Sequence, residues 1–376
     1  MADSVYHSYK DREKEKCSDI KTLRKSVLLG EYNDSIIYFN RSYLWKSVLL
    51  NSFKAEFEQD ELHQLPHENP GTDNDNWVGH SKVELSREGV DQDPLDNHHD
   101  KPETNGFKDE TDILAVIKMD VERLIIDPIF QQEEIKNDII QILYNYDKFT
   151  PYKQGFHEIC GLIYLQLYRD KSLIFSSKDI QLETFSIFTA LMNSLTPNFY
   201  NEDNLVGWCI STFNKYLLLI DPNLYDLMIK HYKIESQIWL IRWVRLIFLR
   251  ELGLNNTYKV LDHLICFDYD ITKLIPFIII IFLIKIKMSL VTCEDQGEIL
   301  YLLLHYPYQE YTNDEITEIV RFSIQLYNSS ELNMKIIGTN INKNYHKGLN
   351  WDKIKNLDKL RLELKLQRRV RGALRK

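Results

Sequence analysis

Hydrophobic residues recur at helical spacing along the chain from about residue 110 onward. A first apolar stripe, with Lys118 on the opposite face, is formed by Ile113, Val116, Ile117 and Leu124. A second stripe is formed by Ile135, Ile139, Leu143 and Tyr146. The same pattern predicts further helices at about 156–168, 180–195, 206–219, 223–232, 236–251, 257–266, 274–288, 294–304 and 314–327.

The turn-forming residues also favour a helical protein. The prolines at 151, 197, 222 and 307 fall between the predicted helices, where proline is best tolerated. Only 13 Gly and 10 Pro occur in 376 residues, which argues against a turn-dense β-sandwich. No helical repeat of about 34 residues is visible. The sequence therefore predicts an all-α fold with no significant sheet.

Apolar content and cysteine usage favour a cytosolic protein without a membrane span. The most apolar stretch, 274–284, contains Pro276 and is shorter than the about 20 residues that cross a bilayer. We therefore expect it to be a buried helix. The charged N-terminal residues argue against a signal peptide. Five widely spaced cysteines without a C-x-x-C pair are typical of reduced thiols.

An acidic segment precedes the helical region. Residues 54–112 carry 17 Asp+Glu and 5 Lys+Arg, whereas the whole chain has a net charge of −9. The segment has no helical or strand period, which predicts a disordered insertion at about 55–108. Its adjacent His98 and His99 lack a spaced partner pair, and its aspartates do not fit a calcium loop, so we expect no metal site. The acidic total also argues against nucleic-acid binding.

The C-terminal segment carries the opposite charge. Residues 352–376 contain ten Lys+Arg and three Asp+Glu, with leucines at helical spacing. This composition indicates a basic amphipathic helix. The helix either binds an anionic membrane or partner, or docks on the acidic body of the protein, and the docked alternative is preferred.

Common catalytic signatures are absent from the sequence. It contains no G-x-x-x-x-G-K-[ST] phosphate loop and no G-x-G-x-x-G, H-E-x-x-H or G-x-S-x-G motif. We therefore expect no phosphate cradle of its own.

Asp120 and Arg123 form the first local pattern of interest. Asp120 falls within the apolar face set by Ile117 and Leu124, and Arg123 lies at the edge of that face. A buried carboxylate needs a partner, and a pair at i and i+3 would hold the guanidinium in a fixed direction. The alternative is an ordinary surface ion pair, which contributes little.

The segment 150–158 is the second such pattern. Its Thr-Pro start suggests the beginning of a helix, and Gly155 suggests that the beginning is irregular. Gln154 would then lie at an exposed helix entry with its amide directed outward. The neighbouring His157 and Glu158 are better explained by structural hydrogen bonds than by acid–base catalysis, because the segment contains no nucleophile.

Three short motifs occur in an order that resembles the TBC-domain family of Rab GTPase-activating proteins. They are R-x-x-x-W at 41–45, I-x-x-D-x-x-R at 117–123 and Y-x-Q at 152–154. Further similarity at 130–146, 239–254 and 303–307 extends the resemblance over roughly residues 25–330. There are two departures. Leu-Ile-Ile follows Arg123 where the family usually has T-x-P, and Leu261-Asp262 replaces the usual W-D.

The resemblance implies a two-lobed helical domain. An N-terminal segment at 1–24 would precede a first lobe at 25–200, which contains the acidic insertion. A second lobe at 201–330 would follow, and a C-terminal extension with the basic helix would occupy 331–376.

The resemblance also implies GTPase activation in trans. Arg123 would enter the nucleotide site of a GTP-bound Rab and neutralise charge on the γ-phosphoryl oxygens, while Gln154 would orient the attacking water. Asp120 would direct the arginine, and Tyr152 would support the glutamine turn. The chain would be an activator without a nucleotide site of its own. GTP and Mg²⁺ would belong to the partner, so no cofactor is expected.

Two further roles are implied by the resemblance. Arg41 and Trp45 would be scaffold residues that hold the N-terminal helices to the helix carrying Arg123. The sequence YKQGFHE, with FQQE at 130–133 and DPL at 93–95, is most similar to a branch that acts on endosomal and Golgi Rabs and includes retromer-associated members. That branch implies a cytoplasmic protein peripherally associated with endosome or Golgi membranes, with retromer or another coat complex as a further partner.

The alternative function is a non-catalytic adaptor. Such a helical scaffold would bind a Rab or a coat complex without turnover. The presence of both Arg123 and Gln154 favours catalysis.

Overall fold

The computed structural model describes most of the chain after the acidic segment and two short stretches before it. The described residues are 20–31, 41–50, 110–174, 177–268, 270–307 and 309–347, with positions 362, 363, 366 and 370. All secondary structure in these ranges is helical, which confirms the predicted all-α fold. The acidic insertion with its histidines, and most of the basic C-terminal segment, lie outside the described residues.

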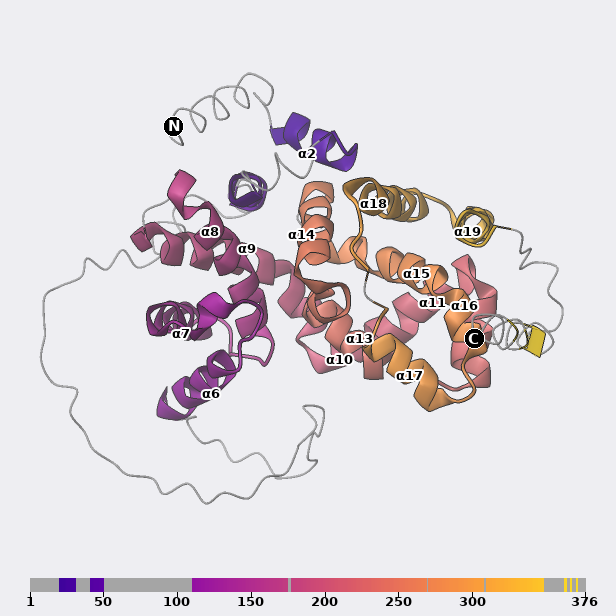
Figure 1. The fold of residues 1–376 in the computed structure, drawn as a ribbon, viewed down its shortest axis with the longest axis horizontal. Helices are drawn as coiled ribbons and strands as arrows, with labels where there is room; N and C mark the ends of the chain where they lie inside the picture. The colour runs from indigo at the N-terminus through magenta and orange to yellow at the C-terminus, as the bar shows by residue number, and fades with distance from the viewer. Residues whose placement is uncertain are drawn as a thin grey trace, which may run out of the picture.

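The first lobe lies on the left of Figure 1 and contains the predicted helix stripes. α8 packs along α9, and α7 contacts both. All four residues of the stripe predicted for α7 are buried. In α6 the buried face is displaced from the predicted one, because Val116 is exposed and Val121 is buried. The elements are η1 (Lys46–Leu50), α6 (Glu110–Glu122), η2 (Pro128–Gln131), α7 (Glu133–Asp147), α8 (Phe156–Ile174) and α9 (Ser177–Phe199).

The second lobe occupies the right of Figure 1 and surrounds α15. Every residue of α15 from Ile275 to Ile284 is buried, which confirms the predicted buried helix. Among the described helices, none combines the length and apolarity needed to cross a bilayer. The elements are α10 (Glu202–Gly207), η3 (Trp208–Phe213), α11 (Asn214–Ile220), α12 (Pro222–Tyr225), η4 (Asp226–His231), α13 (Ser236–Arg245), α14 (Leu249–Phe267), η5 (Ile271–Lys273), α15 (Ile275–Lys285), α16 (Lys287–Thr292), α17 (Gln296–Leu304), α18 (Asn313–Tyr327) and α19 (Glu331–Tyr345).

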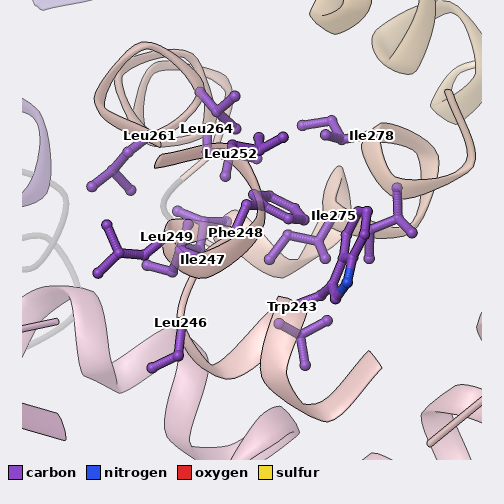
Figure 2. Close-up of a cluster of buried hydrophobic side chains, with 14 of the residues drawn as sticks. Trp243, Leu246, Ile247, Phe248, Leu249, Leu252, Leu261, Leu264, Ile275 and Ile278 are labelled. Atoms are coloured by element: carbon purple, nitrogen blue, oxygen red, sulfur yellow. The ribbon is translucent and has the colours of Figure 1, made fainter. Parts of the chain in front are cut away.

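Two predicted helix boundaries are wrong. The helix predicted at 236–251 is broken between α13 and α14, where Ile247 and Phe248 adopt positive φ angles of 48° and 66°. Both side chains are fully buried, and Figure 2 shows them in the same apolar cluster as Trp243 and Ile275. Burial of this cluster offsets the cost of the left-handed backbone. Pro197, predicted between helices, lies inside α9.

The helix α2 (Ile20–Leu28) packs against α14 and α18 of the second lobe. Arg24 donates hydrogen bonds of 2.7 Å from Nε and Nη2 to the backbone oxygens of Cys266 and Phe267. Cations at this position satisfy the unpaired carbonyl groups at a helix C-terminus. The start of the chain segment predicted as the first lobe is therefore attached to the second.

The helix α19, which the sequence analysis placed in the C-terminal extension, is part of the second lobe. Lys287 on α16 donates hydrogen bonds of 2.7–2.8 Å to both carboxylate oxygens of Asp221, and one of 3.1 Å to Asn342 on α19. The Asn342 amide also donates to Asp221 at 2.9 Å. All three side chains are buried. Because buried charges need complete hydrogen bonding, this network fixes where α19 docks.

Candidate functional site

The end of α6 places an exposed arginine directly after a buried carboxylate. Ile117, Val121 and Leu124 are buried and anchor the end of α6 in the first lobe. Asp120 is only 4% exposed, whereas the Arg123 side chain is 54% exposed. The Nη2 atom of Arg123 forms a hydrogen-bonded ion pair with Oδ1 of Asp120. The guanidinium is therefore oriented from one side and open to solvent on the other.

Tyr152 and His157 occupy the other side of the same carboxylate. The Tyr152 hydroxyl donates a hydrogen bond of 2.7 Å to Oδ2 of Asp120, and His157 Nδ1 lies 3.1 Å from that hydroxyl. Burial is the main cause that lowers the pKa of His157, although the nearby Asp120 raises it. A neutral imidazole fits this position, with Nδ1–H donating to the tyrosine oxygen because the hydroxyl proton is already used.

Gln154 lies in an exposed turn immediately before α8. The turn is held at Tyr152, whose backbone N–H donates to Oδ1 of Asp147 at 2.6 Å. Its other end is Gly155, at a φ of 104° that L side chains rarely adopt. An added Cβ there would lie 3.3 Å from both Tyr200 and Leu246. The irregular helix start predicted from Gly155 is confirmed. The Thr-Pro pair at 150–151 does not begin the helix, because α8 starts at Phe156.

Close contact between α6 and α8 fixes the two halves of the site relative to each other. A Cβ built on Gly161 of α8 would lie 2.8 Å from Leu124, the residue after Arg123. Because Gly161 has no side chain, the end of α6 can pack directly against α8. Arg123 and the Gln154 turn are connected both through Asp120 and through this packing.

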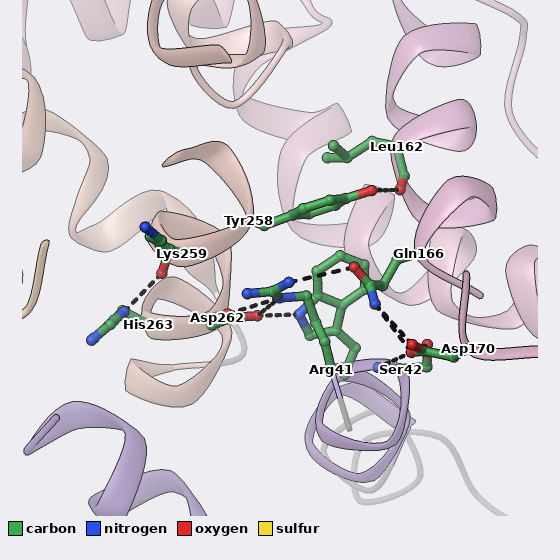
Figure 3. Close-up of polar contacts among 10 residues, drawn as sticks. Arg41, Ser42, Leu162, Gln166, Asp170, Tyr258, Lys259, Asp262 and His263 are labelled. Carbon is green, nitrogen blue, oxygen red and sulfur yellow. Dashed lines mark hydrogen bonds and ion pairs between the residues drawn. The ribbon is translucent and has the colours of Figure 1, made fainter. Parts of the chain in front are cut away.

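Arg41 and Trp45 bind a buried aspartate of the second lobe. Arg41 Nε lies 2.9–3.0 Å from both carboxylate oxygens of Asp262, and Trp45 Nε1 donates to the same group at 2.8 Å. Figure 3 shows the guanidinium between Asp262 of α14 and Gln166 of α8. The prediction that these residues join the N-terminal helices to the helix carrying Arg123 is therefore wrong in its target, because the polar contacts run to α14 and α8.

Three polar residues of this buried network were missed from the sequence. Asp262 was noted only as part of the Leu-Asp pair at 261–262, and neither Gln166 nor Asp170 has a local sequence signal. The Ser42 hydroxyl and backbone N–H both donate to Asp170, and the Gln166 amide lies 3.1 Å from it. Burial raises the pKa of Asp170 to about 6. Networks of this kind specify how helices far apart in sequence are packed.

A comparison with protein-family models identifies the domain. The model of the Rab-GTPase-TBC domain matches residues 73–290, which is more than half of the chain. The chain belongs to this family.

Curated relatives of this TBC domain are much longer proteins. TBC1 domain family member 5 of Homo sapiens is 24% identical over 249 residues, which cover 54% of this chain and 31% of the relative. TBC1 domain family member 5 homolog A of Dictyostelium discoideum is 30% identical over 103 residues, or 27% of this chain and 8% of the relative. The chain thus spans less than a third of the length of these relatives.

Solved structures confirm the fold of this TBC domain. The Ypt/Rab-GAP domain of Gyp1p has a TM-score of 0.60 at 15% identity, with 86% of this chain and 98% of that one covered. A Chlamydomonas flagellar RabGAP TBC domain has a TM-score of 0.55 at 12% identity, with 87% and 96% covered. The predicted two-lobed TBC architecture is confirmed.

The described part of this TBC domain contains no group of three or more His, Cys, Asp or Glu residues arranged to hold a metal ion. A hollow of about 560 Å³ adjoins the Gln154 turn and is lined in part by Pro151, Lys153, Tyr200, Glu202 and Asp203. Open surface therefore lies beside the turn, where a protein partner can approach.

Proposed function

We propose that this chain stimulates GTP hydrolysis by a Rab GTPase, with Arg123 and Gln154 inserted into the partner's nucleotide site. The observation that carries the proposal is the shared carboxylate of Asp120. It accepts hydrogen bonds from Arg123 and from Tyr152, two residues before Gln154. One buried group thus positions an exposed cation and the turn that carries an exposed carboxamide.

Arg123 acts on the transferring phosphoryl group. Negative charge on the γ-phosphoryl oxygens must be stabilised in the transition state, and a planar guanidinium can donate two hydrogen bonds to it. An arginine supplied in trans contributes about 10³ to 10⁵ in rate, which corresponds to roughly 4–7 kcal/mol. Lysine does not reproduce this geometry. The side chain is exposed, and among the described residues only its Nη2 atom is engaged, which leaves donors for this contact.

Gln154 orients the water that attacks the γ-phosphorus. A carboxamide can accept a hydrogen bond from water through its oxygen and donate through its nitrogen, so it directs the oxygen lone pair toward phosphorus. Within the described part of the chain its side chain forms no hydrogen bond, and it is exposed. Mg²⁺ and GTP are carried by the partner, so this chain supplies only positioned polar groups.

The cellular setting is proposed from the motifs at 93–95, 130–133 and 152–158, which resemble the branch that acts on endosomal and Golgi Rabs. We place the chain in the cytoplasm, peripherally associated with endosome or Golgi membranes, where it would regulate vesicle transport. Retromer or another coat complex is the proposed additional partner.

A panel of purified Rabs tests the catalytic proposal and the adaptor alternative together. Each Rab is loaded with GTP and mixed with the chain, and phosphate release is followed in a single turnover. Acceleration of at least one Rab is expected. An adaptor would bind one of them, as measured by biolayer interferometry, and leave its hydrolysis rate at the intrinsic value.

A further inference from the structure

A small pocket opens beside Arg123 on the surface that carries the proposed catalytic groups. Its volume is about 200 Å³. It lies between the segment that follows α6 and the N-terminal part of α14. The lining residues are Arg123, Leu124, Ile125, Ile126, Glu158, Leu249, Arg250 and Leu254.

The most exposed aliphatic side chain of the pocket is Ile125. It is 74% exposed, although Leu124 beside it is buried against Gly161. The backbone at this point is therefore anchored, and the isoleucine is held outward. Burial of this apolar side chain by a bound partner would remove it from water and so favour binding.

The charged part of the pocket is formed by two guanidinium groups, those of Arg123 and Arg250, and the carboxylate of Glu158. Arg250 Nε and Nη2 lie 2.8 and 3.0 Å from the two oxygens of Glu158 on α8. Glu158 is 9% exposed, whereas the Arg250 side chain is 46% exposed. The side-on pair uses one edge of the guanidinium, so donors on the other edge remain for a partner. Arg123, the other guanidinium of the pocket, is paired with Asp120 through one nitrogen, so each arginine offers free donors to a partner.

We propose that this pocket receives an aliphatic side chain of the bound GTPase and an acidic side chain next to it. The aliphatic group packs against Ile125 and Leu254, and the carboxylate is bound by the free edge of Arg250. This inference rests on the proposed function. The occupant is assigned to the GTPase because Arg123 lines the same pocket, so a protein that accepts Arg123 into its nucleotide site also covers the pocket.

In this arrangement the pocket determines which GTPase binds and leaves the chemical step to other residues. Contacts that are equal in the ground state and the transition state change KM and leave kcat unaltered. Ile125 lies two residues from Arg123, yet it contributes only to recognition. Loss of its side chain should weaken binding, whereas loss of Arg123 should slow turnover.

The test uses the variant Ile125→Ser and a Rab that the wild-type chain accelerates. Affinity is measured with that Rab loaded with a non-hydrolysable GTP analogue, and kcat and KM with GTP. We expect Kd and KM to rise about tenfold, with kcat within twofold of wild type. Ile125→Leu should restore affinity. The control is Ile336→Ser, because Ile336 is 61% exposed on α19, away from the pocket, and should change nothing.

Arg250 is tested with its buried partner neutralised. The double variant Arg250→Gln, Glu158→Gln removes both charges and so leaves no unpaired buried carboxylate. It should weaken binding about tenfold and flatten the salt dependence of Kd, with an unchanged melting temperature.

Failure of the inference is distinguishable from failure of the proposed function. If the wild-type chain accelerates a Rab and the Ile125→Ser variant binds it with unchanged Kd, the pocket assignment is overturned and the catalytic proposal stands. If the wild-type chain binds a Rab without accelerating it, and Ile125→Ser weakens that binding, the pocket assignment stands without catalysis. Binding to no Rab in the panel overturns both.

Discussion

The hydroxyl of Tyr152 donates a hydrogen bond of 2.7 Å to Asp120 and thereby joins the Gln154 turn to the helix that presents Arg123. The two residues are 32 positions apart in the sequence. The carboxylate is 4% exposed and cannot exchange this bond for water at low cost. The relative placement of the two proposed catalytic groups therefore depends on this buried acceptor as well as on the packing of α6 against α8.

Removing the Tyr152 hydroxyl should slow catalysis more than it weakens binding. The variant Tyr152→Phe keeps the ring packed on Phe156 but releases the turn from Asp120. We expect kcat to fall about tenfold to a hundredfold, because small displacements of positioned groups are costly, and stability to fall by about 1–3 kcal/mol. Single-turnover hydrolysis and urea unfolding measure the two effects. The half-buried Tyr144 on α7 provides a control, since Tyr144→Phe should alter neither; an unchanged kcat for Tyr152→Phe would exclude the positioning role.

Substitution of Arg123 should abolish most stimulation and leave the fold intact. Because the guanidinium is proposed to act in the transition state, Arg123→Ala and Arg123→Lys should each lower the stimulated rate by about two or more orders of magnitude. Asp120 is buried and keeps only the Tyr152 hydroxyl as a donor in the alanine variant, so we expect the chain to fold with a modestly lower melting temperature. The matched control is Arg321→Ala, which removes an exposed arginine from α18. Stimulation by the Arg123→Ala variant at the wild-type rate would refute the assignment.

Local sequence patterns were sufficient to predict the main features of the site. A carboxylate on an apolar helix face predicted the burial of Asp120, and spacing of three residues predicted its pairing with Arg123. A glycine after Gln154 predicted an irregular and exposed turn. These features depend on neighbours within a few residues, so they are encoded locally.

The features of the fold that the sequence did not predict depend on contacts between residues far apart in the chain. Arg41 and Asp262 are 221 positions apart, and nothing near either residue identifies the other as its partner. The left-handed backbone at Ile247 is disfavoured by its own β-branched side chain and is formed because the surrounding cluster is buried. Because its sequence is polar, α19 was not predicted as a helix. It is held against the second lobe by the buried hydrogen bonds of Asn342 with Lys287 and Asp221.

A side chain at Gly155 should disturb the Gln154 turn. The backbone φ of 104° strains any L residue, and the new Cβ would press on Tyr200 and Leu246. Gly155→Ala is expected to cost about 1–3 kcal/mol in stability and to lower kcat, with a smaller effect on affinity for the Rab.

The control for Gly155 is Gly207→Ala on α10. A Cβ there meets nothing within 4 Å, and the backbone is helical, so this variant should be as stable as wild type or more stable. Urea unfolding and single-turnover hydrolysis compare the two variants. Equal stability of the two alanine variants would show that the turn tolerates a side chain.

The buried Glu251 predicts how stability changes with pH. Burial raises the pKa of this carboxyl from 4.5 to about 7, although Arg242 donates to Oε1 at 2.6 Å and lowers it. Its Oε2 forms no hydrogen bond with the described residues. Between about pH 4.5 and 7 the folded state therefore holds a proton that the unfolded state has released. The free energy of unfolding contributed by this group is fully present below pH 4.5 and is lost as the pH rises toward 7.

The variant Glu251→Gln imitates the protonated carboxyl and should remove this dependence. The difference in free energy of unfolding, variant minus wild type, should grow by about 1–3 kcal/mol from pH 4.5 to pH 8. Each unit of pKa shift corresponds to about 1.4 kcal/mol, and only wild type loses this stability as the pH rises. Urea unfolding at several pH values measures the difference. The exposed Glu331, paired with Lys215, serves as the control, and Glu331→Gln should follow the wild-type curve. Parallel curves for Glu251→Gln and wild type would mean that the buried carboxylate remains ionised in the folded protein throughout this range, held by Arg242.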